Sequence, residues 1–282
     1  MKFEEMINTI QLGDCYELIK NIPDKSIDCV YVDVPYLYIS GGAGTSDIAK
    51  RATKNKIELM GKHKTYDKTK SNKENLRIAM NRKNSAIDLI NSDITNGFDY
   101  KKFVQEAFRV MKTCNMFIWC SQMQLLDMMN EIKKYTDSTI QMLVWCKTNP
   151  IPTTNNLWLS DLEYCLYVRD SGIRLNDGYE LKSKWYQSPI NQSDKELYKH
   201  PTIKPLDLVK RHLKHATQKN DIILDCFCGS GTTCLAAKET GRRYIGMEID
   251  KDYYKIATNR LNGILANGQT SFIFDDKGEL IN

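Results

Sequence analysis

A glycine-rich turn between an apolar run and a helix-like segment constrains this chain more than any other feature. Residues Asp225–Thr233 read Asp-Cys-Phe-Cys-Gly-Ser-Gly-Thr-Thr and follow the apolar run Ile222–Leu224. A helix-compatible segment, residues 234–240, comes next and stops at Gly241. This order predicts a strand, a tight turn and a helix.

The composition of the turn is typical of a ligand-binding loop. Gly229 and Gly231 lack a Cβ, so the backbone can bend sharply and approach a ligand, and we expect Thr232 or Thr233 to cap the helix. The next strand-like segment ends at Glu248, where a carboxylate suits the two hydroxyls of a ribose. A nucleoside-bearing cofactor is therefore the first hypothesis, and a purely structural turn is the alternative. The nicotinamide pattern G-x-G-x-x-G and the phosphate loop G-x-x-x-x-G-K are both absent from the sequence.

Composition bounds the class of protein. The chain has 282 residues, of which 41% are hydrophobic, enough for one large domain or one domain with an insertion. No apolar stretch is long enough to cross a membrane, and the N-terminus lacks the apolar core of a signal peptide. The nine cysteines are scattered and predict reduced core residues of a cytoplasmic protein. Cys226 and Cys228 lack the spacing of a zinc site, so we expect no metal.

Alternating strand and helix patterns predict a doubly wound α/β fold with a mostly parallel sheet. A short strand begins at Thr9 and runs into Gly13-Asp14, with a helix after it. Further strands are expected at residues 26–33, 116–120, 139–146, 163–168, 222–224 and 243–248, and helices at 103–111, 125–132, 206–216 and 234–240. The stretch 169–199 is polar and reads as irregular.

One segment accounts for the whole net positive charge of the chain. Residues 37–97 break the periodicity and predict a flexible loop or insertion with some helix. Between Gly41 and Lys83 stand 12 Lys or Arg against 4 Asp or Glu, an excess of 8 in a chain whose net charge is +5. A basic segment of this kind suits contact with phosphates, and a solvated loop without a ligand is the alternative.

Three motifs together resemble one enzyme family. Asp33-Val-Pro-Tyr36 ends a buried strand, His200-Pro-Thr-Ile-Lys-Pro205 opens a helix, and the glycine turn comes last. This order resembles the amino-methylating DNA methyltransferases of the beta class, over residues 10–36 and about 98–264. The resemblance implies a Rossmann-like, S-adenosylmethionine-dependent methyltransferase fold: a mostly parallel seven-stranded sheet with a reversed final strand and a circularly permuted motif order. It also implies a single methyltransferase domain, residues 1–282, with a target-recognition region at 147–199.

The tetrapeptide Asp33-Val34-Pro35-Tyr36 is the expected catalytic motif. The exocyclic amine of adenine is conjugated with its ring, and two acceptors on its hydrogens, the Asp33 carboxylate and the Val34 carbonyl, favour a nitrogen with a usable lone pair. Tyr36 would stack on the flipped base. The reaction needs positioning more than a strong base, and no metal. Val34 stands where the family usually has proline, which would fix φ, so a catalytically impaired DNA-binding homologue is an alternative, as is a mere strand-ending turn.

The resemblance also implies a pocket for S-adenosylmethionine. Asp225 would lie near the amino group of its methionine part, Glu248 would hold the ribose, and Asp14 would accept from the adenine amine. The complete expected set is Asp14, Cys15, His200, Thr202, Lys204, Asp225, Phe227, Gly229, Gly231, Thr232 and Glu248. A helix cap without a ligand is the alternative for His200, and a turn residue is the alternative for Asp14.

The sequence therefore predicts a DNA methyltransferase that modifies the exocyclic amine of adenine in a specific DNA sequence. Asp33 favours adenine only as a family tendency, so the N4 amine of cytosine is an alternative, and methylation of RNA or of a protein amide is a rival. Its partner would be double-stranded DNA with the target base flipped out. The family implies a homodimer, and a cognate restriction endonuclease in the same system is left open. No membrane partner is expected.

Overall fold

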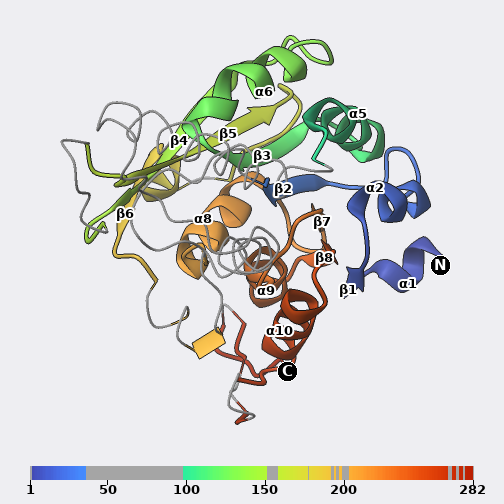
Figure 1. Ribbon diagram of the computed structural model, residues 1–282, viewed down its shortest axis with the longest axis vertical. Helices are drawn as coiled ribbons and strands as arrows, with labels where there is room; N and C mark the ends of the chain where they lie inside the picture. The colour runs from blue at the N-terminus through green and yellow to red at the C-terminus, as the bar shows by residue number, and fades with distance from the viewer. Residues whose placement is uncertain are drawn as a thin grey trace, which may run out of the picture.

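A sheet of eight strands forms the centre of the protein (Figure 1). The computed structural model describes residues 2–35, 98–150, 158–176, 178–191, 194, 197–198, 203–265, 269–270, 273–275 and 277–281. The strands are β1 (Thr9–Leu12), β2 (Cys29–Asp33), β3 (Asn115–Cys120), β4 (Ile140–Lys147), β5 (Leu162–Arg169), β6 (Trp185–Ser188), β7 (Ile222–Asp225) and β8 (Arg243–Glu248). Their order across the sheet is β1-β8-β7-β2-β3-β5-β4-β6.

The sheet is mostly parallel, as predicted. Strands β1, β8, β7, β2 and β3 pair in parallel, and only β5 runs antiparallel to its neighbours β3 and β4 among the described strands. Two details of the prediction were wrong: the sheet has eight strands instead of seven, and the reversed strand is the fifth along the chain, not the final one. The extra strand β6 pairs with β4 at the sheet edge and lies in the polar stretch that read as irregular.

Helices cover both faces of the sheet (Figure 1). One face carries α1 (Phe3–Met6), α2 (Cys15–Leu18), η1 (Ile19–Asn21), α5 (Tyr100–Val110) and α6 (Leu125–Ile132), and the other carries α8 (Leu206–Ala216), α9 (Thr232–Glu239) and α10 (Lys251–Leu261). The short helices η2 (Gln122–Gln124) and η3 (Tyr179–Lys182) lie in connections. In β2, Val30 and Val32 pack toward α5, while Cys29 and Tyr31 pack toward α8. Burial on both faces explains the continuous apolar run of this strand.

Local signals set the helix ends near the glycine turn. Helix α9 begins after Gly231, whose φ of 77° lies in the left-handed region, and it ends before Gly241, whose φ is 73°. The prediction that Thr232 or Thr233 caps this helix was wrong. The Thr232 hydroxyl instead accepts a hydrogen bond from the Arg260 guanidinium at 2.8 Å, and Thr233 hydrogen bonds to the Asp225 carboxyl.

Two predicted regions fall outside the described residues. The whole basic segment 37–97 does so, and part of the predicted recognition region 147–199 does so as well. Within the part of the chain that the structure describes, no helix is long and apolar enough to cross a membrane.

Candidate active site at the carboxyl ends of the strands

Four acidic residues meet at one edge of the sheet. Asp33 ends β2, Asp225 ends β7, Glu248 ends β8, and Asp14 follows β1. Because β2 pairs with β7, β7 with β8, and β8 with β1, all in parallel, these carboxyl ends share one edge. Residues from the first and last quarters of the sequence therefore meet in one place. In open α/β sheets, this edge is where ligands bind.

The glycine turn is built around Glu248. The Gly229 N–H donates to Glu248 Oε2 at 2.8 Å, and the Asp250 N–H donates to Oε1 at 2.8 Å. Gly229 has a φ of 51°, so both predicted glycines adopt left-handed backbone. A Cβ on Gly231 would stand 3.1 Å from the Ala257 Cβ, closer than an ordinary side-chain contact. Glycine at these positions is thus a requirement of the turn itself.

Asp225 is a buried acid with an unusual protonation equilibrium. Burial, with smaller contributions from the charges of Asp33 and Glu248, raises the pKa of Asp225 to about 7. The Phe227 N–H donates to its Oδ1 at 3.1 Å and opposes the rise. Burial also raises the pKa of Glu248. The three carboxylates therefore lie close enough to influence one another, and a cation placed among them would be stabilised.

The side chains on the α2 side complete this edge. Asp14 caps α2 by accepting from the Tyr16 N–H at 2.7 Å, so it is a turn residue whatever else it binds. Burial raises the pKa of the Cys15 thiol to about 12, which keeps it neutral. Phe227 packs its ring against Phe98 and Phe103, with centroids 5.4 and 5.5 Å apart. The turn is thereby anchored to α5 as well as to the sheet.

The backbone after Asp33 is held by two hydrogen bonds. The Val34 N–H donates to the Trp119 carbonyl at 3.0 Å, a bond that a proline at this position could not make. The Gln124 side chain donates to the Pro35 carbonyl at 2.9 Å, and its own oxygen accepts from the Ser121 N–H at 3.0 Å. Val34 itself is buried. These contacts thus replace the rigidity that a proline ring would give at position 34. The sequence analysis did not single out Gln124.

Lys204 lies against Asp33 of the predicted catalytic motif. Its ammonium is 2.5 Å from Asp33 Oδ2 and 3.0 Å from Glu163 Oε2, and it stands 5.3 Å from the centroid of the Trp119 ring. Glu163 in turn pairs with Lys147 at 2.8 Å. The sequence grouped Lys204 with the cofactor residues and did not single out Glu163 or Lys147, because an acid within an apolar strand gives no local signal of its partners.

Some predicted site residues are not placed. Tyr36, His200 and Thr202 lie outside the described residues, so the structure brings together the other members of the predicted set only. Over the described ranges, no cluster of three or more His, Cys, Asp or Glu side chains could hold a metal ion.

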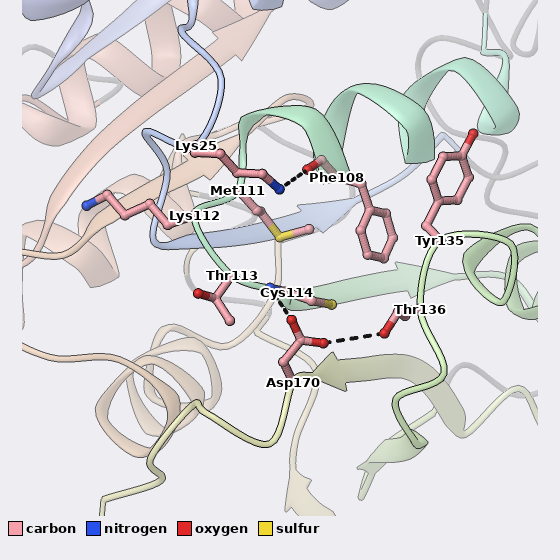
Figure 2. Close-up of a pocket in the computed structure, with 9 residues that line it drawn as sticks. All are labelled: Lys25, Phe108, Met111, Lys112, Thr113, Cys114, Tyr135, Thr136 and Asp170. Carbon is pink, nitrogen blue, oxygen red and sulfur yellow. Dashed lines mark hydrogen bonds between the residues drawn. The ribbon is translucent and has the colours of Figure 1, made fainter.

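A separate pocket of about 320 Å³ opens at the opposite edge of the sheet (Figure 2). Lys25, before β2, and Asp170, after the reversed strand β5, place it at the amino ends of the parallel strands. Asp170 accepts from the Cys114 N–H at 3.1 Å and from the Thr136 hydroxyl at 3.3 Å, while Lys25 donates to the Phe108 carbonyl at 3.2 Å. These contacts tie the ends of the strands together, and the pocket takes no part in the site described above.

The chain is similar in sequence to Type II methyltransferases and in fold to a DNA methyltransferase. The chain is 28% identical over 265 residues to the Type II methyltransferase M2.LlaDCHI of Lactococcus lactis subsp. cremoris, covering 89% of this chain and 87% of that protein. It is 27% identical over 281 residues to M.HinfI of Haemophilus influenzae, covering 93% and 70%. Among solved structures, M1.HpyAVI superposes with a TM-score of 0.59 at 22% identity, covering 90% of this chain and 98% of that one. The PvuII cytosine-N4-specific DNA methyltransferase superposes equally well at 13% identity, covering 89% and 85%.

The family model described as DNA methylase, N6_N4_Mtase, matches residues 27–259. That span includes the Asp33 motif, the Lys204 segment and the glycine turn, which the fold gathers at one edge. The chain therefore belongs to the N6_N4_Mtase family of DNA methylases.

Proposed function

We propose that this protein is a site-specific DNA methyltransferase that uses S-adenosylmethionine to methylate the exocyclic amine of adenine. The observation that carries the proposal is the direct parallel pairing of β2 with β7. This pairing sets the end of the catalytic strand, Asp33, beside the turn that begins at Asp225. Donor and acceptor sites would then face each other across one strand spacing.

The residues present fit the cofactor. Its methionine part carries an ammonium group, and Asp225 is a buried carboxyl, its pKa raised by burial, whose ionised form a neighbouring cation would stabilise. Its ribose carries two hydroxyls, and Glu248 stands at the tip of β8 with its two oxygens oriented by backbone N–H groups. Each carboxylate oxygen has two lone pairs, so these bonds leave capacity to accept from hydroxyls. M1.HpyAVI, of the same fold, has been solved as a complex with SAM.

We assign the remaining residues by position. Gly229, Gly231 and Phe227 would line the methionine part, and Thr232 would begin the helix beneath it. Asp14 would accept from the adenine amine of the cofactor, with the Cys15 N–H beside it. His200 and Thr202 remain assigned by the motif alone.

The chain's own residues would orient the target amine. The Asp33 carboxylate and the Val34 carbonyl accept its two hydrogens, which turns the nitrogen lone pair toward the cofactor. When bound, S-adenosylmethionine supplies a methyl group on a sulfonium, so that the S–C bond breaks as the N–C bond forms and a neutral thioether leaves. The amine nitrogen then loses one proton to solvent. Pro35 fixes the chain direction after the motif, and Tyr36 would stack on the base.

DNA is the proposed partner, with the base flipped out of the duplex. The basic segment within residues 37–97 and the region 147–199 would contact it. The Type II names of the relatives support a place in a restriction–modification system with a cognate endonuclease. A homodimer is also part of the proposal.

Transfer of tritium from labelled S-adenosylmethionine to unmethylated DNA, followed by nucleoside analysis, tests the function. We expect label in N6-methyladenine and none in cytosine. Label in cytosine would identify the N4 amine of cytosine as the methyl acceptor in place of adenine, as named for the PvuII enzyme. If the wild-type protein neither binds the cofactor nor methylates DNA, the result would instead support a catalytically impaired DNA-binding homologue.

Asp33→Ala is the matched variant. Because Asp33 would hold the amine and not the cofactor, the variant should lose transfer and retain S-adenosylmethionine binding by calorimetry. Weaker cofactor binding in this variant would show that the residue has been assigned to the wrong side of the site.

A further inference from the structure

Four charged side chains form a continuous chain behind the catalytic motif, which we call the lysine–carboxylate chain: Lys147, Glu163, Lys204 and Asp33. Lys147 Nζ lies 2.8 Å from Glu163 Oε1, and Lys204 Nζ lies 3.0 Å from Glu163 Oε2 and 2.5 Å from Asp33 Oδ2. The geometry points to Lys204 as a positioning residue that holds Asp33 as an oriented carboxylate, with Glu163 holding Lys204 in turn. This inference rests on the function proposed above.

The chain is mostly shielded from water. The side chain of Lys204 is 10% exposed and that of Glu163 is 20% exposed, whereas that of Asp33 is 31% exposed. Burying an ammonium is costly unless charged partners compensate. Here two carboxylates and the face of the Trp119 indole, 5.3 Å away, provide that compensation. The ammonium therefore has a defined place between two acids instead of a range of rotamers in water.

This place matters to the proposed chemistry. To accept a hydrogen bond from the target amine, Asp33 must be ionised, and an ammonium at 2.5 Å favours that form. A carboxylate offers about four lone-pair directions, so the contact at Oδ2 does not exhaust its capacity to accept. The same ammonium makes the carboxylate a weaker base. Asp33 should therefore orient the amine by hydrogen bonding and not remove its proton before the methyl group is transferred.

Glu163 keeps the ammonium in position. Burial would raise the pKa of Glu163, but the ammonium groups of Lys204 and Lys147 outweigh it and lower that pKa to about 2. Glu163 is thus an anion throughout any assay range. Its charge lies near Asp33 as well, so its removal and the removal of Lys204 should change the ionisation of Asp33 in opposite directions.

Among the described residues, the other titratable groups whose charge interacts with Asp33 include Cys120, Tyr31, Cys165 and Asp225. Burial raises the pKa of Cys120 on β3 to about 12 and those of Tyr31 on β2 and Cys165 on β5 well above their usual range, so all three stay neutral. Asp225 on β7 has a pKa of about 7 and titrates in the assay range. Because it is present in every variant, differences between variants report on Lys204 and Glu163.

The test follows Asp33 directly by ¹³C NMR of protein labelled at the aspartate carboxyl carbons, with the resonance identified by its loss in Asp33→Asn. In Lys204→Met, we expect the titration midpoint of Asp33 to rise by about one to two pH units. In Glu163→Gln it should fall. In Lys204→Arg, which keeps the charge, it should stay near the wild-type value.

Steady-state kinetics give a second readout. At saturating S-adenosylmethionine and neutral pH, Lys204→Met should lower kcat about 100-fold, a loss typical of removing one preorganised electrostatic contact. The acidic limb of its pH profile should move upward, and cofactor affinity by calorimetry should change less than about threefold. Glu131→Gln is the matched control, because Glu131 is a buried acid paired with Lys134 at 2.7 Å on α6. It should leave the profile unchanged.

Two results would overturn the inference: an unmoved Asp33 midpoint in Lys204→Met, or a loss confined to cofactor affinity with kcat retained. If Lys204→Met does not fold, Glu163→Gln and Lys204→Arg serve as the test. An Asp33 midpoint that rises or does not move in Glu163→Gln, while Lys204→Arg stays near the wild-type value, would also overturn the inference. If the variants show these shifts but the wild-type protein transfers no methyl group, the proposed function is wrong and the pairing of Lys204 with Asp33 still holds.

Discussion

At the scale of single residues, the acids at the strand ends have different environments. Asp33 is paired with an ammonium, whereas Asp225 is buried without a nearby cation among the contacts that set its protonation. Glu248 is held by backbone N–H groups. In the proposed function, these carboxyl groups, a strand spacing or two apart, would bind different partners: an amine, an ammonium and a pair of hydroxyls.

The raised pKa of Asp225 predicts a pH-dependent affinity for S-adenosylmethionine. Below about pH 7 the carboxyl is protonated and cannot pair with the cofactor ammonium, so affinity should strengthen as pH rises from about 6 to about 8. Binding below pH 7 should release a proton. Calorimetry in two buffers of different ionisation enthalpy measures both effects.

Asp225→Asn is the companion variant for that titration. It should bind the cofactor more weakly, and the pH dependence should disappear because the group no longer titrates. Persistence of the same pH dependence in Asp225→Asn would assign it to another residue, with Glu248 the next candidate since burial raises its pKa as well.

At the scale of elements, α10 holds the glycine turn from behind. Arg260 is buried, and its guanidinium donates to the Thr232 hydroxyl at 2.8 Å and the Ser230 hydroxyl at 3.3 Å. It also pairs with Asp194 at 3.2 Å and stacks over Tyr198 at 4.6 Å. One side chain thus joins the turn to the segment that precedes the His200 motif.

Arg260→Met should therefore weaken S-adenosylmethionine binding at least about tenfold and lower the melting temperature, since it leaves the partners of a buried guanidinium unpaired. Calorimetry and thermal unfolding measure these effects. Arg243→Met is a suitable control. The partly exposed Arg243 side chain donates to the Asn220 carbonyl at the other edge of the sheet, so the affinity for S-adenosylmethionine should not change. Equal losses in both variants would show that the effect is only one of global stability.

The elements themselves were largely predictable, and the reasons are local. The apolar runs of β2 and β7, the glycines of the turn and the stop at Gly241 all act within a few residues. What failed depends on distant partners. Thr232 does not cap α9 because Arg260 of α10 takes its hydroxyl, and β6 forms in a polar stretch because the edge of β4 is available to pair.

The site divides in the same way. Motif order was enough to single out Asp33, Asp225, the glycines and Glu248 as candidates, and the fold places them at one edge, while their roles stay a prediction. The contact of Lys204 with Asp33 was not predictable, because it joins residues far apart in sequence, and Glu163 on β5 pairs with the same ammonium. Gln124 was missed for the same reason: its partner is the Pro35 carbonyl, and a backbone oxygen leaves no trace in the sequence.

At the scale of the whole molecule, the core contains a buried polar cluster with a consequence for acid stability. The Tyr31 hydroxyl lies 3.1 Å from His212 Nδ1 and accepts a hydrogen bond from the Trp119 indole N–H at 3.0 Å. Burial, helped by the charge of Arg211, lowers the pKa of His212 to about 3. In the unfolded chain this imidazole takes a proton near pH 6.5, whereas in the fold it stays neutral.

Stability should therefore fall as pH drops from about 6.5 toward 3, because the unfolded state binds a proton that the folded state refuses; the full span corresponds to roughly 5 kcal/mol. Glu163 adds a second loss below about pH 4.5, since its pKa in the fold is about 2. Chemical denaturation at several pH values measures both. In His212→Gln, which cannot titrate, the loss between pH 6.5 and 4.5 should flatten; an unchanged slope would remove His212 as its source.

The strand order β1-β8-β7-β2 has a consequence for how the protein is made. Strands β8 and β7, from the end of the chain, lie between β1 and β2, from its beginning, so one edge of β2 lacks its partner until β7 has been synthesised. Late, long-range pairing of this kind slows folding and exposes the nascent chain to aggregation. It also means that a polypeptide terminated before β7 keeps Asp14 and Asp33 but lacks Asp225, the glycine turn and Glu248. Such a truncated chain should transfer no methyl group, because the proposed cofactor residues of β7 and β8 are missing from it.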